Sequence, residues 1–327
     1  PACSPDGTQI AFLRDRRELR LLTIESKQER VLATGMFADA IDAPEPVWGP
    51  GGTWIAAFMI GAKSFTNVHL IPVAEGGGPP RPISGLANVY ANSIAWTPDG
   101  TTVLFDTRQR TEQGQLARVD LTLRTPKFRE DLFRDLFTQN PQTPRTPNSP
   151  PPANSPPPAA TAPPLATPRL AATSDPVFDE IRRRLSFLPL GLDVQRVAVS
   201  PDGKVALITA TSAGQTNLYT YSLDELAAER PVPRQLTSTA GGKSDAQFSP
   251  DGREVFFLEG GRIQIATVES RAVRPVNVTA EFTTDFAVEK MDVFRQAWTL
   301  MRDNFYDPKF HGVDWEASRE TYGPWVE

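Results

Sequence analysis

Three residues near the C-terminal end of the chain have the side chains of a nucleophilic hydrolase. His311, Asp314 and Ser318 lie within eight residues of one another, and a serine activated by a histidine that a carboxylate orients is the arrangement used for acyl transfer. In such enzymes, however, the fold assembles the triad and places the nucleophile at a sharp, exposed turn. We instead expect Asp314 to cap a helix and His311 to lie in the loop before it. The sequence predicts no catalytic residue among the three.

The sequence contains few residues of the types that bind metals or cofactors. The chain holds two histidines, His69 and His311, and one cysteine, Cys3, which excludes an internal disulfide and a cluster of thiolate ligands. His69 lies in an alternating pattern typical of a strand, so we assign it to a blade surface. The net charge of −5 is small and dispersed. We therefore predict no cofactor, no metal, no nucleic-acid partner and no insertion into a membrane.

Aspartate recurs in a four-residue turn that the chain repeats. Proline sets φ at the first central position, aspartate bonds to nearby backbone and glycine accepts the closing geometry. These carboxylates could bind a cation or substrate around a ring, but the turn already explains them, and we predict a structural role. The copies are Ser4-Pro5-Asp6-Gly7, a worn Gly49-Pro50-Gly51-Gly52, Thr97-Pro98-Asp99-Gly100, Ser200-Pro201-Asp202-Gly203 and Ser249-Pro250-Asp251-Gly252.

The spacing of the turns predicts the fold. They recur at intervals of 45, 48, 103 and 49 residues, which is typical of stacked supersecondary units. Short apolar runs flank each turn and a third and a weaker fourth run follow, so each repeat contains four strands, as in the blade of a β-propeller. The predicted fold class is mainly β, a β-propeller with about five four-stranded blades. The third strands are expected at 19–24, 68–73, 116–121, 218–222 and 263–268.

The first blade is expected to be cut open. The chain begins with Pro1, and the first turn arrives with almost no strand before it. Because propellers contain roughly 4–8 blades, we expect an N-terminally truncated chain and an incomplete ring.

A proline-rich insertion accounts for the one long interval. Twelve prolines lie between residues 141 and 168, and such a segment buries too little apolar surface to offset its ordering entropy. We predict a disordered insertion over 138–176 and expect the fourth strand of blade three at 181–188. A solvated loop and a proline-motif docking site for a partner both remain open. Just before the insertion, five apolar residues predict a short helix that packs on the propeller: Phe128, Leu132, Phe133, Leu136 and Phe137.

Where a further turn is due, near residue 298, a helical pattern begins instead. Apolar side chains recur at intervals of three and four residues, which predicts a helix over about 286–306. A second helix is expected from Asp314 to Tyr322. The stripe of the first helix consists of Met291, Phe294, Trp298, Met301 and Phe305.

The blade turns and the helical segment together resemble a known family. The blade repeat is similar to that of TolB-like and tricorn-type propellers. The run from Glu289 through Asp307, with His311-Gly312-Val313-Asp314-Trp315-Glu316 after it, resembles the opening of a tricorn-type protease core of the S41, tail-specific serine peptidases. In that family a propeller region precedes a helical subdomain, a PDZ domain and a catalytic subdomain. The same order of blades and helices supports the resemblance.

The resemblance implies a function that this chain performs only in part. Family members hydrolyse peptides with a serine nucleophile and a histidine base, and both positions are expected beyond Glu327. The implied partners are peptide substrates, which the propeller binds or gates, and further copies of the chain in a homo-oligomer. The compartment stays open, because tricorn implies the cytoplasm whereas TolB-like blades and many bacterial relatives imply export.

The expected domains are blades over 1–280 and the first helices of a protease core over 281–327. Three other classes are alternatives: a TolB-like non-catalytic interaction module, an α/β-hydrolase peptidase with a Gly-x-Ser-x-Gly motif downstream, and a metal-dependent amidohydrolase with clustered histidines. The helix pair argues against all three.

Overall fold

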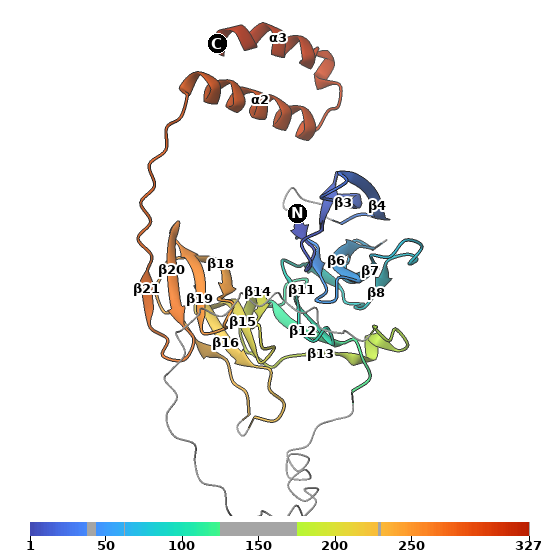
Figure 1. Cartoon of the computed structure of the whole chain (residues 1–327), viewed down its shortest axis with the longest axis vertical. Helices are drawn as coiled ribbons and strands as arrows, with labels where there is room; N and C mark the ends of the chain where they lie inside the picture. The colour runs from blue at the N-terminus through green and yellow to red at the C-terminus, as the bar shows by residue number, and fades with distance from the viewer. Residues whose placement is uncertain (38–43, 62, 125–174, 228–229, 327) are drawn as a thin grey trace, which may run out of the picture. The chain divides into compact units, whose positions relative to one another are not determined.

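A computed structural model describes residues 1–37, 44–61, 63–124, 175–227 and 230–326. Figure 1 gives the order of its elements. The chain divides into two compact units, Pro1–Val276 and Asn277–Glu327. The predicted helix at 128–137, and the predicted insertion up to residue 174, lie outside the described residues.

The first unit consists of five antiparallel sheets, and each sheet follows the chain order of its strands. Sheet 1 contains β1 (Ala2–Cys3), β2 (Gln9–Arg14), β3 (Glu18–Thr23) and β4 (Gln28–Thr34). Sheet 2 contains β5 (Val47–Trp48), β6 (Trp54–Ile60), β7 (Thr66–Pro72) and β8 (Arg81–Pro82). Sheet 3 contains β10 (Ile94–Trp96), β11 (Thr102–Gln109), β12 (Gln115–Asp120) and β13 (Leu185–Phe187), and β9 (Asn88–Tyr90) also pairs with β11.

Sheet 4 contains β14 (Asp193–Val199), β15 (Val205–Ser212), β16 (Gln215–Ser222) and β17 (Arg234–Gln235). Sheet 5 contains β18 (Lys243–Phe248), β19 (Glu254–Glu259), β20 (Arg262–Thr267) and β21 (Val273–Pro275). Each third strand begins one to three residues before the predicted position. The predicted mainly-β fold with four-stranded blades is confirmed.

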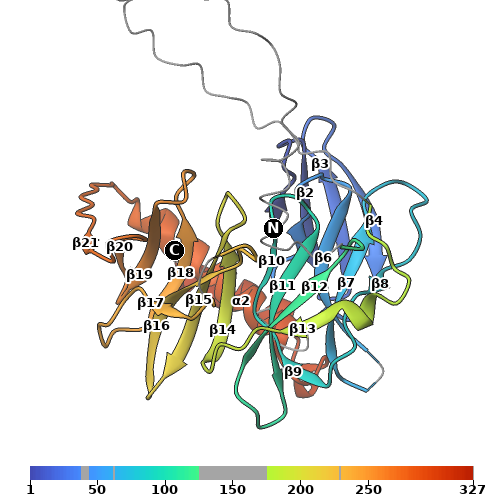
Figure 2. The same cartoon turned by 90° about the horizontal axis from the view of Figure 1, so that it is seen from below.

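Successive sheets lie side by side (Figure 2), and their first strands meet. β1 contacts β5, β5 contacts β10, β10 contacts β14, and β14 contacts β18. The first strand of each sheet therefore occupies the inner position, as in the blades of a propeller.

The apolar core is divided into layers between consecutive sheets. Along β11, Val103 and Phe105 pack against sheet 2, whereas Leu104 packs against sheet 4. This alternation follows from the period of two in a strand. A further apolar layer lies between sheets 1 and 2, and another lies between sheets 4 and 5. Sheets 2, 3 and 4, which have a neighbouring sheet on each side, therefore have two apolar faces each.

The repeated turn is held by its own side chains. In the fourth copy the Ser200 hydroxyl donates to Asp202 Oδ1 at 2.5 Å and accepts from Val205 N at 2.9 Å, while Gly203 N donates to Ser200 O at 2.8 Å. The hydrogen bond from Ser200 lowers the pKa of Asp202. The other three aspartate-containing copies make the same hydroxyl-to-carboxylate bond. The structural role predicted for the turn aspartates matches this geometry.

The turns also contact one another between blades. Gly203 has φ +75°, and a Cβ added there would lie 3.1 Å from Pro98 Cδ of the preceding turn. At Gly252 the corresponding distance to Pro201 is 3.4 Å. The left-handed φ favours glycine at both positions, and at Gly203 the proline of the previous blade adds a tight contact, whereas 3.4 Å at Gly252 is an ordinary contact.

A polar clasp fixes the fourth strand in two sheets. In sheet 2, Ser84 Oγ donates to Asn67 Oδ1 at 2.8 Å and accepts from Val68 N. In sheet 4, Thr237 Oγ1 donates to Asn217 Oδ1 at 3.0 Å. These hydroxyls are buried and satisfied, so the clasp closes the outer edge without leaving an unpaired polar group.

The segment before β13 corrects one prediction. Residues 181–188 were expected to form a strand, but Ile181–Arg184 is a 3₁₀ turn, η1, and only Leu185–Phe187 pairs with β12. The reason is local packing: Ile181 is 5% exposed in the core between sheets 2 and 3. Phe178 anchors the preceding residues, with its ring 5.5 Å from Trp54 and the Arg81 guanidinium 3.4 Å from its centroid.

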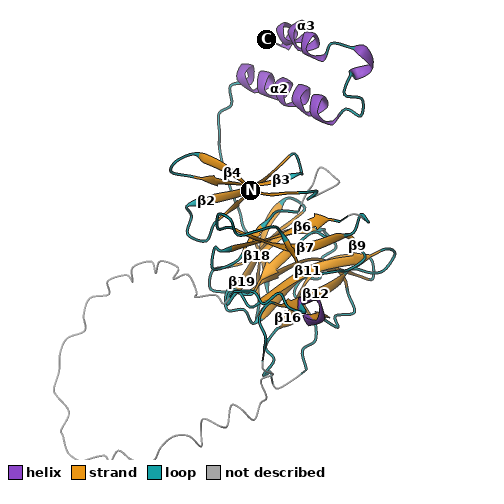
Figure 3. Cartoon of the chain, turned by 90° about the vertical axis from the view of Figure 1, so that its right-hand side faces the viewer, coloured by secondary structure: helices purple, strands orange, loops and turns teal. Residues whose placement is uncertain are grey.

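The second unit contains α2 (Phe286–Asn304), a 3₁₀ turn η2 (Phe310–Gly312) and α3 (Trp315–Val326). Figure 3 shows helices there and strands in the first unit. Asp285 caps α2 by accepting from Ala287 N at 2.9 Å. The helix pair was predicted, but α3 extends four residues past Tyr322.

Trp298 holds the two helices together. It is 6% exposed, its ring stacks on Trp315 at 6.2 Å, and the two indole N–H groups donate to each other's backbone oxygens. Met301, predicted on the same apolar stripe, is 49% exposed. The buried part of the stripe is therefore narrower than the spacing indicated.

We expect Trp298→Ala to destabilise the helix pair by about 3–5 kcal/mol, because it removes a buried indole and leaves a cavity. Urea unfolding of the helices, followed by far-ultraviolet circular dichroism, measures the change. Leu300→Ala, an exposed position of the same helix, is the control and should cost less than about 1 kcal/mol. Equal losses in the two variants would contradict a central role for Trp298.

The contact between turns predicts a second difference in stability. Gly203→Ala should cost about 1 kcal/mol more than Gly7→Ala. Both glycines have a left-handed φ near +70°, which penalises any added Cβ, but no atom lies within 4 Å of a Cβ at Gly7. Denaturant midpoints of the two variants give the comparison. Identical losses would mean that the neighbouring proline gives way without cost.

Candidate functional site

The three residues with hydrolase-like side chains have separate structural partners. Asp314 Oδ1 accepts from Ala317 N at 3.0 Å, as a helix cap does, and Ser318 Oγ donates to Trp315 O at 2.5 Å. His311 instead contacts Asp307 through Nδ1, at 3.3 Å, and Tyr306 through Nε2. Among the described residues neither histidine is hydrogen-bonded to a serine. His311, Asp314 and Ser318 do not form a nucleophile–base pair.

His69 is a partly buried strand residue. Its Nδ1 lies 3.1 Å from Asn67 O, and burial lowers its pKa. A neutral imidazole at this position fits the predicted blade-surface role. Within the described ranges no group of three or more histidine, cysteine or acidic side chains could hold a metal ion. No helix among these residues is both long and apolar enough to span a bilayer.

Two of the turn aspartates meet at a groove between sheets 3 and 4. Asp99 and Asp202 both line this pocket of about 360 Å³, together with Arg118, Arg124 and Leu223. Hydrogen bonds within each turn lower the pKa of both carboxyl groups, although partial burial opposes the shift at Asp99. Both are therefore ionised at neutral pH.

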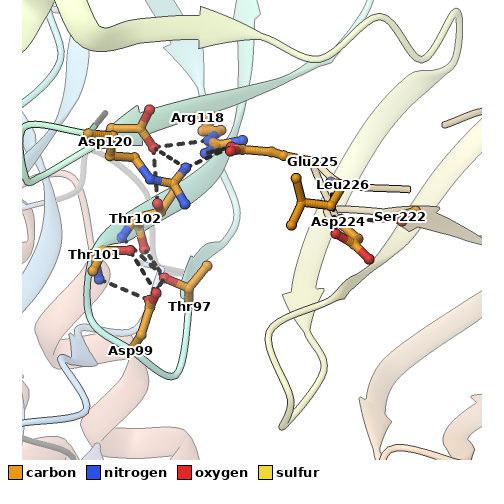
Figure 4. A network of polar contacts seen from close by, with 11 residues as sticks. Thr97, Asp99, Thr101, Thr102, Arg118, Asp120, Ser222, Asp224, Glu225 and Leu226 are labelled. Carbon is orange, nitrogen blue, oxygen red and sulfur yellow. Dashed lines mark hydrogen bonds and ion pairs between the residues drawn. The ribbon is translucent and has the colours of Figure 1, made fainter. Parts of the chain in front are cut away.

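A charged network forms one wall of the groove (Figure 4). Arg118 contacts Asp120 at 3.0 Å and Glu225 at 2.7 Å, and Arg124 contacts Glu225 at 2.8 Å. Thr102 Oγ1 donates to Asp120 Oδ1. Because Glu225 follows β16 whereas both arginines belong to or follow β12, the network joins sheets 3 and 4. Both guanidinium groups have carboxylate partners, so these arginines link sheets 3 and 4.

A second junction joins the inner strands of the same two sheets. Asp106, 2% exposed on β11, accepts from the backbone N–H and side-chain amide of Asn92 and from the backbone N–H and hydroxyl of Ser93. Asn92 Nδ2 also donates to Gln195 O at 3.1 Å, and Ser93 Oγ accepts from Val197 N at 2.8 Å. One buried carboxylate therefore orders the residues that bind the backbone of β14.

Burial raises the pKa of Asp106 from 3.8 to about 6, against the hydrogen bonds from Asn92 and Ser93, which lower it. The raised pKa means that ionising this group opposes folding. Its favourable contribution is fully present below about pH 4 and is lost as the pH rises through 6. A shift of about two units corresponds to roughly 3 kcal/mol.

We expect wild type to lose about 3 kcal/mol of stability relative to Asp106→Asn between pH 4 and pH 7, because the asparagine cannot ionise. A constant offset should accompany this change, since an amide accepts fewer hydrogen bonds than a carboxylate. Urea unfolding at pH 4, 5, 6 and 7 measures both. A wild-type-minus-variant difference that is the same at every pH would show that Asp106 does not titrate in this range.

Comparison with known protein families gives a match over the helical segment. Residues 286–327 match the family model described as the tricorn protease C1 domain. An alignment over 103 residues, which covers 28% of this chain, is 26% identical to tricorn protease homolog 1 of Streptomyces coelicolor. The match spans 10% of that relative's length.

Solved structures bear on the fold. The crystal structure of the tricorn protease aligns with 99% of this chain and 30% of its own, at 13% identity and a TM-score of 0.65. A putative TolB from Agrobacterium tumefaciens aligns with 84% of this chain and 78% of its own, at 17% identity and a TM-score of 0.52. At these identities both show the propeller-type fold alone.

Together these findings define a protein with propeller blades followed by a protease-associated helical segment. More particularly, the helical segment matches a tricorn C1 domain, and the blades before it are similar in fold to part of the tricorn protease. The predicted resemblance is confirmed, and the C1 match disfavours the TolB-like interaction module.

Proposed function

We propose that this chain supplies the substrate-handling part of a tricorn-like serine peptidase. In this role the blades bind or gate peptide substrates and the helices lead into a proteolytic core. The observation that carries the proposal is the C1 match at residues 286–327, directly after the last blade. A TolB-like interaction module gives no reason for that segment.

The geometry of the described residues supports a binding role rather than chemistry. Their histidines contact Asn67, Tyr306 and Asp307 but no serine. The inner strands, in contrast, carry exposed polar side chains such as Arg196, Asp245 and Gln247. Such side chains can contact a passing peptide, so recognition falls to the blades. Assembly of further copies of the chain into a homo-oligomer is part of the same proposal.

The isolated chain should bind peptides without cleaving them. Fluorescence anisotropy with a mixed pool of labelled ten-residue peptides measures binding, and mass spectrometry of the same samples measures hydrolysis. Binding with intact peptides is the expected result. Cleavage that a serine-directed inhibitor blocks would contradict the assignment of catalysis to residues outside this chain. Absence of binding would contradict the substrate-handling role.

A further inference from the structure

A pocket of about 340 Å³ opens where the inner strands of sheets 3 and 4 meet. It is separate from the groove of Figure 4 and shares none of its lining residues. Tyr90 and Arg108 line it from sheet 3, and Gln195 and Arg196 line it from β14. Tyr90 is 66% exposed, so the pocket presents an aromatic surface beside two guanidinium groups.

A bulge in β14 brings Arg196 to this pocket. The register of β14 against β15 shifts between Val194 and Arg196, and a bulge of this kind redirects side chains and often lies next to a functional site. Arg196 is exposed, and its side chain makes no hydrogen bond or ion pair with any residue in the described part of the chain.

The other charges at the pocket are already matched. Arg108 contacts Asp193 through Nη2 at 2.5 Å, which leaves the rest of its guanidinium N–H groups available. Asp106 is buried, and its carboxylate accepts hydrogen bonds from four donor groups of Asn92 and Ser93. Arg196 is therefore the one arginine of the pocket that has no carboxylate partner among the described residues.

We propose that this pocket binds a single carboxylate, with Arg196 as its main ligand and Arg108 as the second donor. A planar guanidinium fits a carboxylate in a bidentate manner, and one unmatched positive charge suits a monoanion better than a dianionic phosphate. The size of the pocket and the exposed ring of Tyr90 suit a side chain that carries the carboxylate. The ligand is accordingly a glutamate or aspartate side chain of a peptide. This last step rests on the proposed peptide-handling function, whereas carboxylate binding itself does not.

Binding of two blocked pentapeptides tests the proposal. One has a central glutamate and the other a glutamine in its place, and acetylated and amidated ends leave the glutamate as the only charge. Isothermal titration of the full chain should show about tenfold tighter binding of the glutamate peptide, as charge-assisted pairing requires. Butyrate, a monoanion, is titrated separately and probes the carboxylate without a peptide.

Arg196→Gln should abolish the preference for glutamate. Arg234→Gln is the matched control, because Arg234 is an exposed arginine on β17, at the opposite edge of the same sheet, and it should leave the preference unchanged. Thermal denaturation of both variants checks that they fold.

The outcomes separate this inference from the proposed function. Equal binding of both peptides by wild type would overturn the carboxylate site and leave peptide binding intact. Binding of butyrate that depends on Arg196, with neither peptide bound, would support the site and contradict the peptide as its carrier. If neither butyrate nor either peptide binds, the carboxylate site is wrong.

Discussion

Burial of both faces of sheets 2, 3 and 4 is the constraint on which the rest of the first unit depends. Consecutive residues of one strand enter different apolar layers, as Val103 and Leu104 do on β11. A single such sheet would expose both apolar faces to water at a cost of roughly 25 cal/mol for each Å², so it is stable only between neighbours. The turns and inner strands then fix how closely the neighbours approach. Pro98 against Gly203 is one such contact, and Asn92 and Ser93 against β14 are another.

Sheets 3 and 4 show how polar groups share this task with apolar ones. At one end the paired charges of Arg118, Arg124 and Glu225 join them, and at the other the buried Asp106 does so. Partly exposed ion pairs contribute little each, whereas a buried carboxylate with four donors specifies geometry strongly. The unmatched Arg196 lies beside that ordered junction. A rigid wall is what a selective binding pocket needs, and this part of the molecule supplies one.

Local sequence predicted the features whose cause is local. The turn residues, the strands beside them, the capped helix pair and the tricorn resemblance all follow from short segments. The clasp between Asn67 and Ser84 joins positions 17 residues apart, and Asp106 acts on β14 across the long interval of the repeat. No spacing rule predicts hydrogen-bond partners so far apart in the sequence. An asparagine next to the apolar run of the third strand does recur in two repeats, as Asn67 and Asn217, and this recurrence could have indicated the clasp. The prediction of a strand over 181–188 was wrong because Ile181 is buried in the core between sheets 2 and 3.

The worn turn at Gly49–Gly52 shows what the repeat can lose. It lacks the hydroxyl and the carboxylate, yet Gly52 keeps φ +70° and donates to Gly49 O at 2.9 Å, and Gly49 donates to Trp54 O. The backbone path thus survives without the side chains that brace it elsewhere. Among the described residues the main contacts of each sheet are with its immediate neighbours, so sequence change in one sheet chiefly affects at most two others. In such an architecture a single sheet can lose turn residues of the repeat, be duplicated or acquire a new role while the other sheets still fold.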